Sequence, residues 1–242
     1  SANYIFNTVA SNNNNAASGG KDGDTLEEIR QNSISNYSSQ LRNVTADDYL
    51  VRSLSMPSRY GIISKAYTQK PNIEDYLSSL DIYVLSYNVN KKLTPASSTL
   101  KRNLKTYLNQ YRMIGDTISI KDAFVINVGC SFEIITLPNI NNNEVLLNCI
   151  TSLQDYFDIN KWQINQPIIL RDLQLLIDNI EGVQTVKKVE IINKAGTSSG
   201  YSKYAYDIKG ATQNGVIYPS LDPSIFELKF LNQDIKGKVV TI

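Results

Sequence analysis

The feature that most constrains the fold is Ala123–Ile135, a long segment in which large apolar side chains occupy every second position. The alternating residues are Phe124, Ile126, Val128, Cys130, Phe132 and Ile134. Period two places all of them on one face of a β-strand, whereas an α-helix would scatter them around its circumference. One face of this strand is therefore core, and the other face is more polar.

The neighbouring segments alternate between strand and helix signals. Leu80–Asn88 carries apolar residues on both faces, which is typical of a central strand. Thr94 and Pro95 are the residue types of an N-cap and a first helical position, and predict a helix to about Arg112. Further predicted elements are helices at Val145–Phe157 and Ile168–Ile180, a helix stop at Gly182 and a strand at Val183–Ile192. The sequence thus predicts an α/β (α+β) fold, a compact mixed sheet with packed helices over residues 80–193.

The N-terminal residues divide into a linker and a helical part. Residues 1–24 include the polar run Asn12–Asn15 and read as a flexible linker or edge segment. Residues 25–79 read as a helical subdomain with a short strand. Its first helix, Thr25–Arg42, opens with a capping box, and Thr45–Asp48 gives the start signal of a second helix that runs to about Leu54.

The C-terminal residues 194–242 form a β-rich tail in this reading. Short β candidates lie at Val216–Tyr218, Phe226–Leu231 and Val239–Ile242, separated by turn residues. We expect a C-terminal β-rich appendage on the α/β unit. The sequence leaves open whether these strands pair within the chain or with a neighbouring chain.

Composition excludes several classes of function. The chain has no histidine, so Ser-His-Asp and Cys-His catalytic devices and histidine-ligated metals are excluded within it. The net charge is +1 and the cations are dispersed, which argues against nucleic acid as a partner. No apolar run is long enough to cross a bilayer, so we expect no membrane partner. Cys130 and Cys149 lie in apolar patterns and are expected to be buried and reduced.

Two acidic clusters can be interpreted either as functional sites or as parts of helix starts. Asp22-Gly23-Asp24 could begin a calcium loop, but Leu26 and Ser33 then fall on positions five and twelve, where oxygen ligands are needed. Asp47 and Asp48 could be an acid/base pair, but neighbours on a helix point about 100° apart. Helix capping and the helix dipole explain both clusters better, and we expect no metal, cofactor or catalytic residue.

Tyrosines gather in the tail at Tyr201, Tyr204 and Tyr206. Tyrosine is favoured at protein interfaces, and exposed aromatic side chains also serve as platforms for sugars. The cluster therefore fits a protein interface, a glycan site or ordinary packing.

The chain resembles the contractile-phage baseplate wedge family, the baseplate J-like proteins, and in particular the C-terminal part of the large T-even-type wedge subunit. The resemblance covers residues 19–193 and depends on motifs that follow one another in the family's order. These are Gly19–Asp22 with Leu26–Arg30, Val44–Tyr49, Asn103–Leu108 with Asp116–Ile120, and Gly182–Val186.

This resemblance implies a structural component of the virion, located in the tail baseplate and assembled in the host cytoplasm. It implies a homodimer within a larger ring that contacts other baseplate wedge proteins, and no enzyme activity. The elements expected to make contacts are the Asn12–Asn15 loop and the Thr25–Arg42 helix. The alternative is a glycan- or protein-binding module of a virion.

Overall fold

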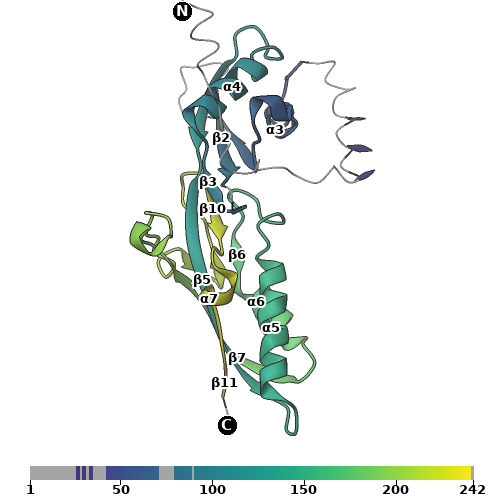
Figure 1. The fold of residues 1–242 in the computed structure, drawn as a ribbon, viewed down its shortest axis with the longest axis vertical. Coiled ribbons are helices and arrows are strands. Elements are labelled where there is room, and N and C mark those ends of the chain that lie inside the picture. The colour runs from purple at the N-terminus through teal and green to yellow at the C-terminus, as the bar shows by residue number, and fades with distance from the viewer. Residues whose placement is uncertain are drawn as a thin grey trace, which may run out of the picture.

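The computed structural model describes residues 42–70, 79–88 and 90–240, together with residues 26, 27, 29, 30, 33 and 34. The predicted linker 1–24 lies outside these residues, as does most of the predicted helix Thr25–Arg42. The molecule is elongated, and two sheets follow one another along its long axis (Figure 1). We call the described residues of 42–122 the upper half and residues 124–240 the lower half, as they lie in that view.

The upper half is a four-stranded sheet with helices packed against it. Strand β2 is central, as predicted, because β1 and β3 pair with it antiparallel and β4 pairs with it in parallel. The elements are α3 (Ala46–Leu54), η1 (Ser58–Tyr60), β1 (Lys65–Gln69), β2 (Ser79–Tyr87), β3 (Leu93–Pro95), α4 (Ser98–Leu108) and β4 (Thr117–Asp122).

The start of α3 confirms the prediction made for it. The Thr45 hydroxyl accepts from the amide of Asp48 at 3.2 Å, and the Asp48 carboxylate accepts from the amide of Thr45 at 2.8 Å. Helix α4 begins later than predicted. Thr94 and Pro95 belong to strand β3, and the cap is Ser97, whose hydroxyl accepts from the amide of Leu100. The Thr-Pro pair was mistaken for a helix start because pairing with β2 decides its conformation.

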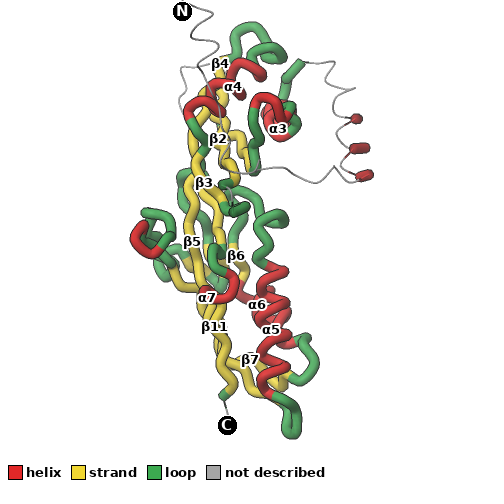
Figure 2. The backbone as a smooth tube through the Cα atoms, viewed as in Figure 1, coloured by secondary structure: helices red, strands yellow, loops and turns green. Residues whose placement is uncertain are grey.

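The lower half is built around β5, the long strand that the alternating pattern predicts. The strand predicted at residues 183–192 is β7, and it pairs with β5 antiparallel. Helices α5 and α6 lie along one side of this sheet (Figures 1 and 2). The elements are β5 (Phe124–Thr136), α5 (Asn142–Tyr156), β6 (Ile168–Ile169), α6 (Leu170–Asp178), β7 (Val183–Asn193), η2 (Thr197–Ser199), β8 (Thr212–Gln213), β9 (Val216–Ile217), β10 (Ser224–Glu227), α7 (Leu231–Asp234) and β11 (Ile235–Val239).

The tail pairs within its own chain, which settles a question that the sequence left open. Strands β10 and β11 run parallel to β5, opposite Phe124–Asn127 and Cys130–Ile134. Since β7 pairs with the same residues 130–134, β11 must lie on the other side of β5. The tail therefore completes the lower sheet, where we expected an appendage, because β5 has a second edge that needs a partner.

The α/β class is confirmed, but the strands of residues 80–193 belong to three sheets instead of one. Strand β2 belongs to the upper sheet and β5 to the lower one, and a small third sheet contains β6, β9 and β8. The domain boundaries drawn from the sequence stay predictions of how the chain divides.

Each half has its own apolar core. The lower core contains Phe132, Leu153 and Trp162, and the upper core contains Ile82, Leu104 and Leu108. Cys130 and Cys149 are free and buried, as expected, and burial raises the pKa of the two thiols to about 12 and about 11.

Candidate functional site at the junction of the two halves

The two halves are joined by a single passage of the described backbone. Strand β4 ends at Asp122 and β5 begins at Phe124, so only Ala123 lies between the two sheets. Ala123 is buried, and the strand continues from one sheet to the next (Figure 2). Every other connection between the halves is non-covalent, which makes the junction the place where their relative orientation is set.

A buried carboxylate spans the junction. Glu227, on β10 of the lower half, is 2% exposed. One of its oxygens accepts from the amide of Leu93, on β3 of the upper half, at 2.9 Å, and the other accepts from Nδ2 of Asn127 at 2.8 Å. Burial raises the pKa of the Glu227 carboxyl group, and these two hydrogen bonds oppose that shift. No salt bridge is found for Glu227 among the described residues, so hydrogen bonds hold it.

Asn127 extends this connection through the lower half. Its side-chain oxygen accepts from the amide of Ser202 at 2.7 Å while its Nδ2 donates to Glu227. Its carbonyl accepts from the amide of Lys194 at 2.9 Å and from Nδ2 of Asn193 at 3.2 Å. Asn127 therefore ties β5 to the end of β7, to the following loop and to β10, all next to the junction.

A buried cation makes a second connection across the junction. Lys65 on β1 is 6% exposed, and its Nζ donates to the carbonyl of Asn160, in the lower half, at 3.0 Å. Burial lowers the pKa of Lys65 to about 8, and the negative charge of Asp158 only partly offsets that effect. Tyr87 adds a longer hydrogen bond of 3.4 Å to the side chain of Asn160.

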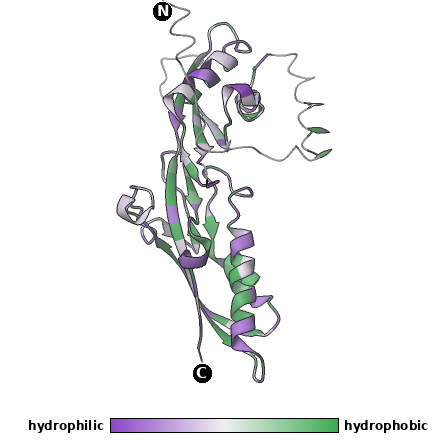
Figure 3. Cartoon of the chain, viewed as in Figure 1, coloured by the Kyte–Doolittle hydropathy of each residue, from purple (hydrophilic) through white to green (hydrophobic). Residues whose placement is uncertain are grey.

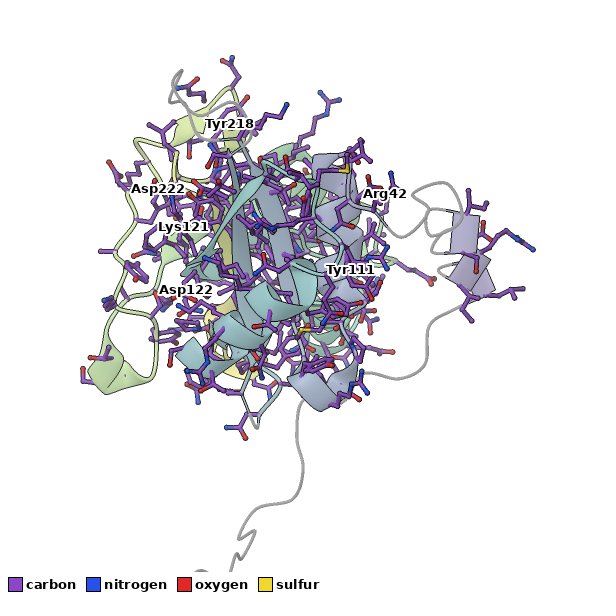
Figure 4. The ribbon with its side chains drawn as sticks, turned by 90° about the horizontal axis from the view of Figure 1, so that it is seen from above. Arg42, Tyr111, Lys121, Asp122, Tyr218 and Asp222 are labelled. Carbon is purple, nitrogen blue, oxygen red and sulfur yellow. The ribbon has the colours of Figure 1, made fainter. Side chains whose placement is uncertain are left out.

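Charged side chains also surround the covalent passage. Lys121 pairs with Asp81 at 2.7 Å, and Lys101 pairs with Asp122 at 2.7 Å. The hydrogen bond to Asp81 raises the pKa of Lys121, with a smaller contribution from the charge of Asp222 in the lower half. Figure 4 shows Lys121, Asp122 and Asp222 on the same side of the molecule. The Lys101–Asp122 pair is partly exposed and contributes in general up to about 1 kcal/mol, whereas Asp81 is 7% exposed, so solvent screens its pair with Lys121 less.

Apolar side chains fill the remainder of the junction. Leu85 and Leu93 belong to strands of the upper sheet but pack in the lower core. Tyr67, Tyr83 and Tyr87 are partly buried against the same core. The junction therefore combines apolar contact with buried polar groups that have specific partners.

The residues considered in the sequence analysis lie elsewhere or have structural partners. Asp48 caps α3, and Asp22-Gly23-Asp24 lies outside the described residues. The tail tyrosines bind within the lower half: the hydroxyl of Tyr201 donates to Asp234 and that of Tyr206 to the carbonyl of Tyr218, while Tyr204 packs edge-on against Phe124.

The sequence reasoning missed Glu227, Asn127 and Lys65. A signal existed for Glu227, which sits between Phe226 and Leu228, whereas Asn127 falls on the more polar face of the alternating strand and gives no such signal. A polar residue inside an apolar strand needs a buried partner. No comparable pattern marks Lys65.

Three other kinds of site can be compared with the described part of the chain: a metal site, a membrane span and a sugar platform at Trp162. The described part contains no group of three or more Cys, Asp or Glu side chains placed to hold a metal ion. None of its helices combines the length and the apolar character needed to span a bilayer. A groove of about 530 Å³ beside α5 includes Trp162 in its lining, but this side chain is 2% exposed and stacks on Phe157, so it offers no platform to a sugar.

Comparison with solved structures finds chains of similar fold. A chain in the cryo-electron microscopy structure of the anti-feeding prophage baseplate, 6-fold symmetrised, has a similar fold, with a TM-score of 0.54 and 11% sequence identity. The match covers 84% of this chain but only 42% of the length of that one. No protein-family model matches the sequence, and neither does any curated protein. The likeness is thus one of fold, and the resemblance to baseplate J-like wedge proteins stays a prediction.

Proposed function

We propose that this chain is a structural component of the baseplate of a contractile tail or related injection machine. The observation that carries the proposal is the fold shared with a baseplate chain over 84% of this chain. The sequence motifs of the baseplate J-like wedge family point to the same kind of protein independently. The virion tail is the corresponding location, with assembly in the host cytoplasm.

The proposed role is mechanical and does not involve catalysis. An elongated body whose halves are tied through Glu227 and Lys65 can transmit force between partners bound at its two ends. The absence of histidine removes the commonest general base, which supports a role without chemistry.

The location can be tested on purified contractile particles from the source of the sequence. Immunogold labelling with antibodies against this chain should mark the baseplate end of the tail. Antibodies against the tail sheath serve as the control, because they mark the whole length. Gold along the sheath, or on no particle at all, would contradict the proposal.

The finer proposal is self-association as a homodimer within a ring, with further contacts to other wedge subunits. Light scattering after size-exclusion chromatography, over a dilution series, should give a dimer mass that persists on dilution. A monomer at all concentrations would remove self-association by this chain alone. Specific binding on a glycan array would instead favour the alternative, a binding module of the virion.

A further inference from the structure

The junction consists of one connecting residue, which we call the pivot, and two hydrogen bonds between the halves, which we call the clasp. The pivot is Ala123, the single residue between β4 and β5. The clasp consists of the hydrogen bonds from the Leu93 amide to Glu227 and from Lys65 Nζ to the Asn160 carbonyl. Each bond joins one half to the other, so a rotation about Ala123 that moves Leu93 away from Glu227 and Lys65 away from Asn160 breaks both.

The hydrogen bonds of the clasp can break at a moderate cost in free energy, because both involve a buried charged side chain. Glu227 and Lys65 are both almost fully buried, and each is held by neutral groups with no salt bridge among the described residues. A buried charge without a salt bridge gives up much of its hydration free energy, and the nearby charges, Asp158 for Lys65 and Lys92 and Lys229 for Glu227, recover only part of it. Opening the junction would return both charges to water, and this gain offsets much of the loss of the hydrogen bonds. An apolar junction of the same size would lack this compensation.

Apolar contact between the halves also resists rotation. The upper half's share of the lower core comes from Leu85 and Leu93, with Tyr67, Tyr83 and Tyr87 at the margin. Each half keeps its own sheet and its own core, so both can move as bodies.

We infer that the chain has two orientations of its halves, related by rotation about Ala123, and that the Leu93–Glu227 and Lys65–Asn160 bonds hold the closed one. This is a property of the chain alone. It goes beyond the proposed function, in which it would let one subunit fit two states of an assembly.

The test measures the distance between the halves in the full chain. Spin labels at Lys105→Cys on α4 and Asn148→Cys on α5 report it by double electron–electron resonance. Both positions are exposed, whereas the native cysteines are buried. We expect one narrow distance distribution when the clasp is intact.

The decisive variants change the hydrogen bonding of the clasp while keeping the size of the side chains. Glu227→Gln leaves a single, uncharged acceptor oxygen for two donors, the Leu93 amide and Nδ2 of Asn127, so the bond across the junction is either lost or reduced to a neutral one. Losing a hydrogen bond to a charged group should shift the ratio of open to closed molecules by roughly tenfold to a hundredfold. The double variant Asn127→Asp with Glu227→Gln reverses the bond and lets residue 127 still accept from Ser202. It should restore the narrow distribution.

Two further variants complete the design. Lys65→Met opens the other half of the clasp and should also broaden the distribution. Lys188→Gln removes an exposed ion pair with Glu190 in the lower half and should change nothing. The Trp162 fluorescence of each variant checks that the lower core remains folded.

A broad distribution in the parent chain, or one that stays narrow in both Glu227→Gln and Lys65→Met, would overturn the clasp. Either result would leave the proposed function standing. Failure of the immunogold test would do the reverse.

Discussion

The two halves differ in how far apart in the sequence their strands lie. In the upper half, every strand pairs with a strand between residues 65 and 122. In the lower half, β5 pairs with strands that come as late as Ile235–Val239. The lower sheet is therefore made by long-range pairing, which has to overcome a larger loop-closure entropy.

The halves also differ in what stabilises them. The core of the lower half consists of large apolar side chains, including Phe132, Phe226 and Trp162, and its long strand β5 is mostly green in Figure 3. The upper half has a smaller core, and both halves add polar ties, such as Tyr49 to Asp116 in the upper half and Tyr201 to Asp234 in the lower half. We conclude that the distant pairing of the lower half is compensated by its larger apolar core.

The largest expected effect is that of Phe132→Ala in the lower core. The side chain is 1% exposed, and its truncation should lower the free energy of unfolding by about 4 kcal/mol. Urea titration followed by Trp162 fluorescence measures this change. Leu104→Ala in the upper core is the matched variant, followed by circular dichroism as well. If fluorescence and circular dichroism report one shared transition in every variant, the two halves unfold as one unit. The halves would then not differ in stability.

The next effect concerns pH and the buried cation of the junction. Folded Lys65 releases its proton near pH 8, whereas the unfolded side chain keeps it to about 10.5. The unfolded state therefore holds more protons between these values, and the free energy of unfolding should rise with pH by up to about 3 kcal/mol across the window. Asp158 is the charged group that opposes this shift.

Urea titrations of the parent chain and Lys65→Met at several pH values measure this effect. In Lys65→Met, the free energy of unfolding should lack the rise with pH that Lys65 contributes. Ionisation of the tyrosines changes the free energy of unfolding of both proteins equally, so it cancels in the comparison. Parallel curves for the two proteins would show that Lys65 is hydrated in the folded state.

A moderate effect is expected for Gly237→Ala on β11. An added Cβ would collide with the ring of Phe132 and press on Leu146, so one of them must move. Overpacking of this kind should cost about 2 kcal/mol. Hydrogen exchange should show faster exchange in β11 and its partner residues of β5, with the upper half unchanged. Equal acceleration in both halves would contradict the separation of the two cores.

The smallest effect is expected at the cap of α3. Thr45→Ala removes the hydroxyl that accepts from Asp48 and should cost about 1 kcal/mol. Thr106→Ala, on the exposed side of α4, is the control and should stay within about 0.5 kcal/mol of the parent. Thermal unfolding measures both variants. A cost of Thr45→Ala no greater than that of the control would mean that the cap does not stabilise the helix in this context.

Features that depend on residues close together in the sequence could be predicted, whereas features that depend on pairing between distant segments could not. The alternation in Ala123–Ile135 and the capping box at Thr45 are local signals, and both are confirmed. Thr94 and Pro95 were assigned to a helix because pairing with β2 leaves no mark in the local pattern. The partners of β5 could not be assigned either, since β10 and β11 are short and their pairing depends on which edge of β5 is free.

The candidate site was hidden for a related reason. Glu227 and Asn127 are 100 residues apart, and only the parallel pairing of β10 with β5 makes them neighbours. Lys65 is buried by contact with the Asn160 loop, which no periodicity reports. Residues that act across a junction are recognised only once the junction is known.

The pairing of β11 with β5 has a consequence for the order of events during synthesis. A ribosome that has released residues 42–122 has already released every described strand of the upper sheet, and that half can mature while translation continues. Strand β5 emerges next but has to wait for more than a hundred residues before Ile235–Val239 can reach it. During this interval its apolar face and one edge are open to chaperones, and equally to other nascent chains. Once Val239 has been released, β11 can pair with this edge of β5 and cover it.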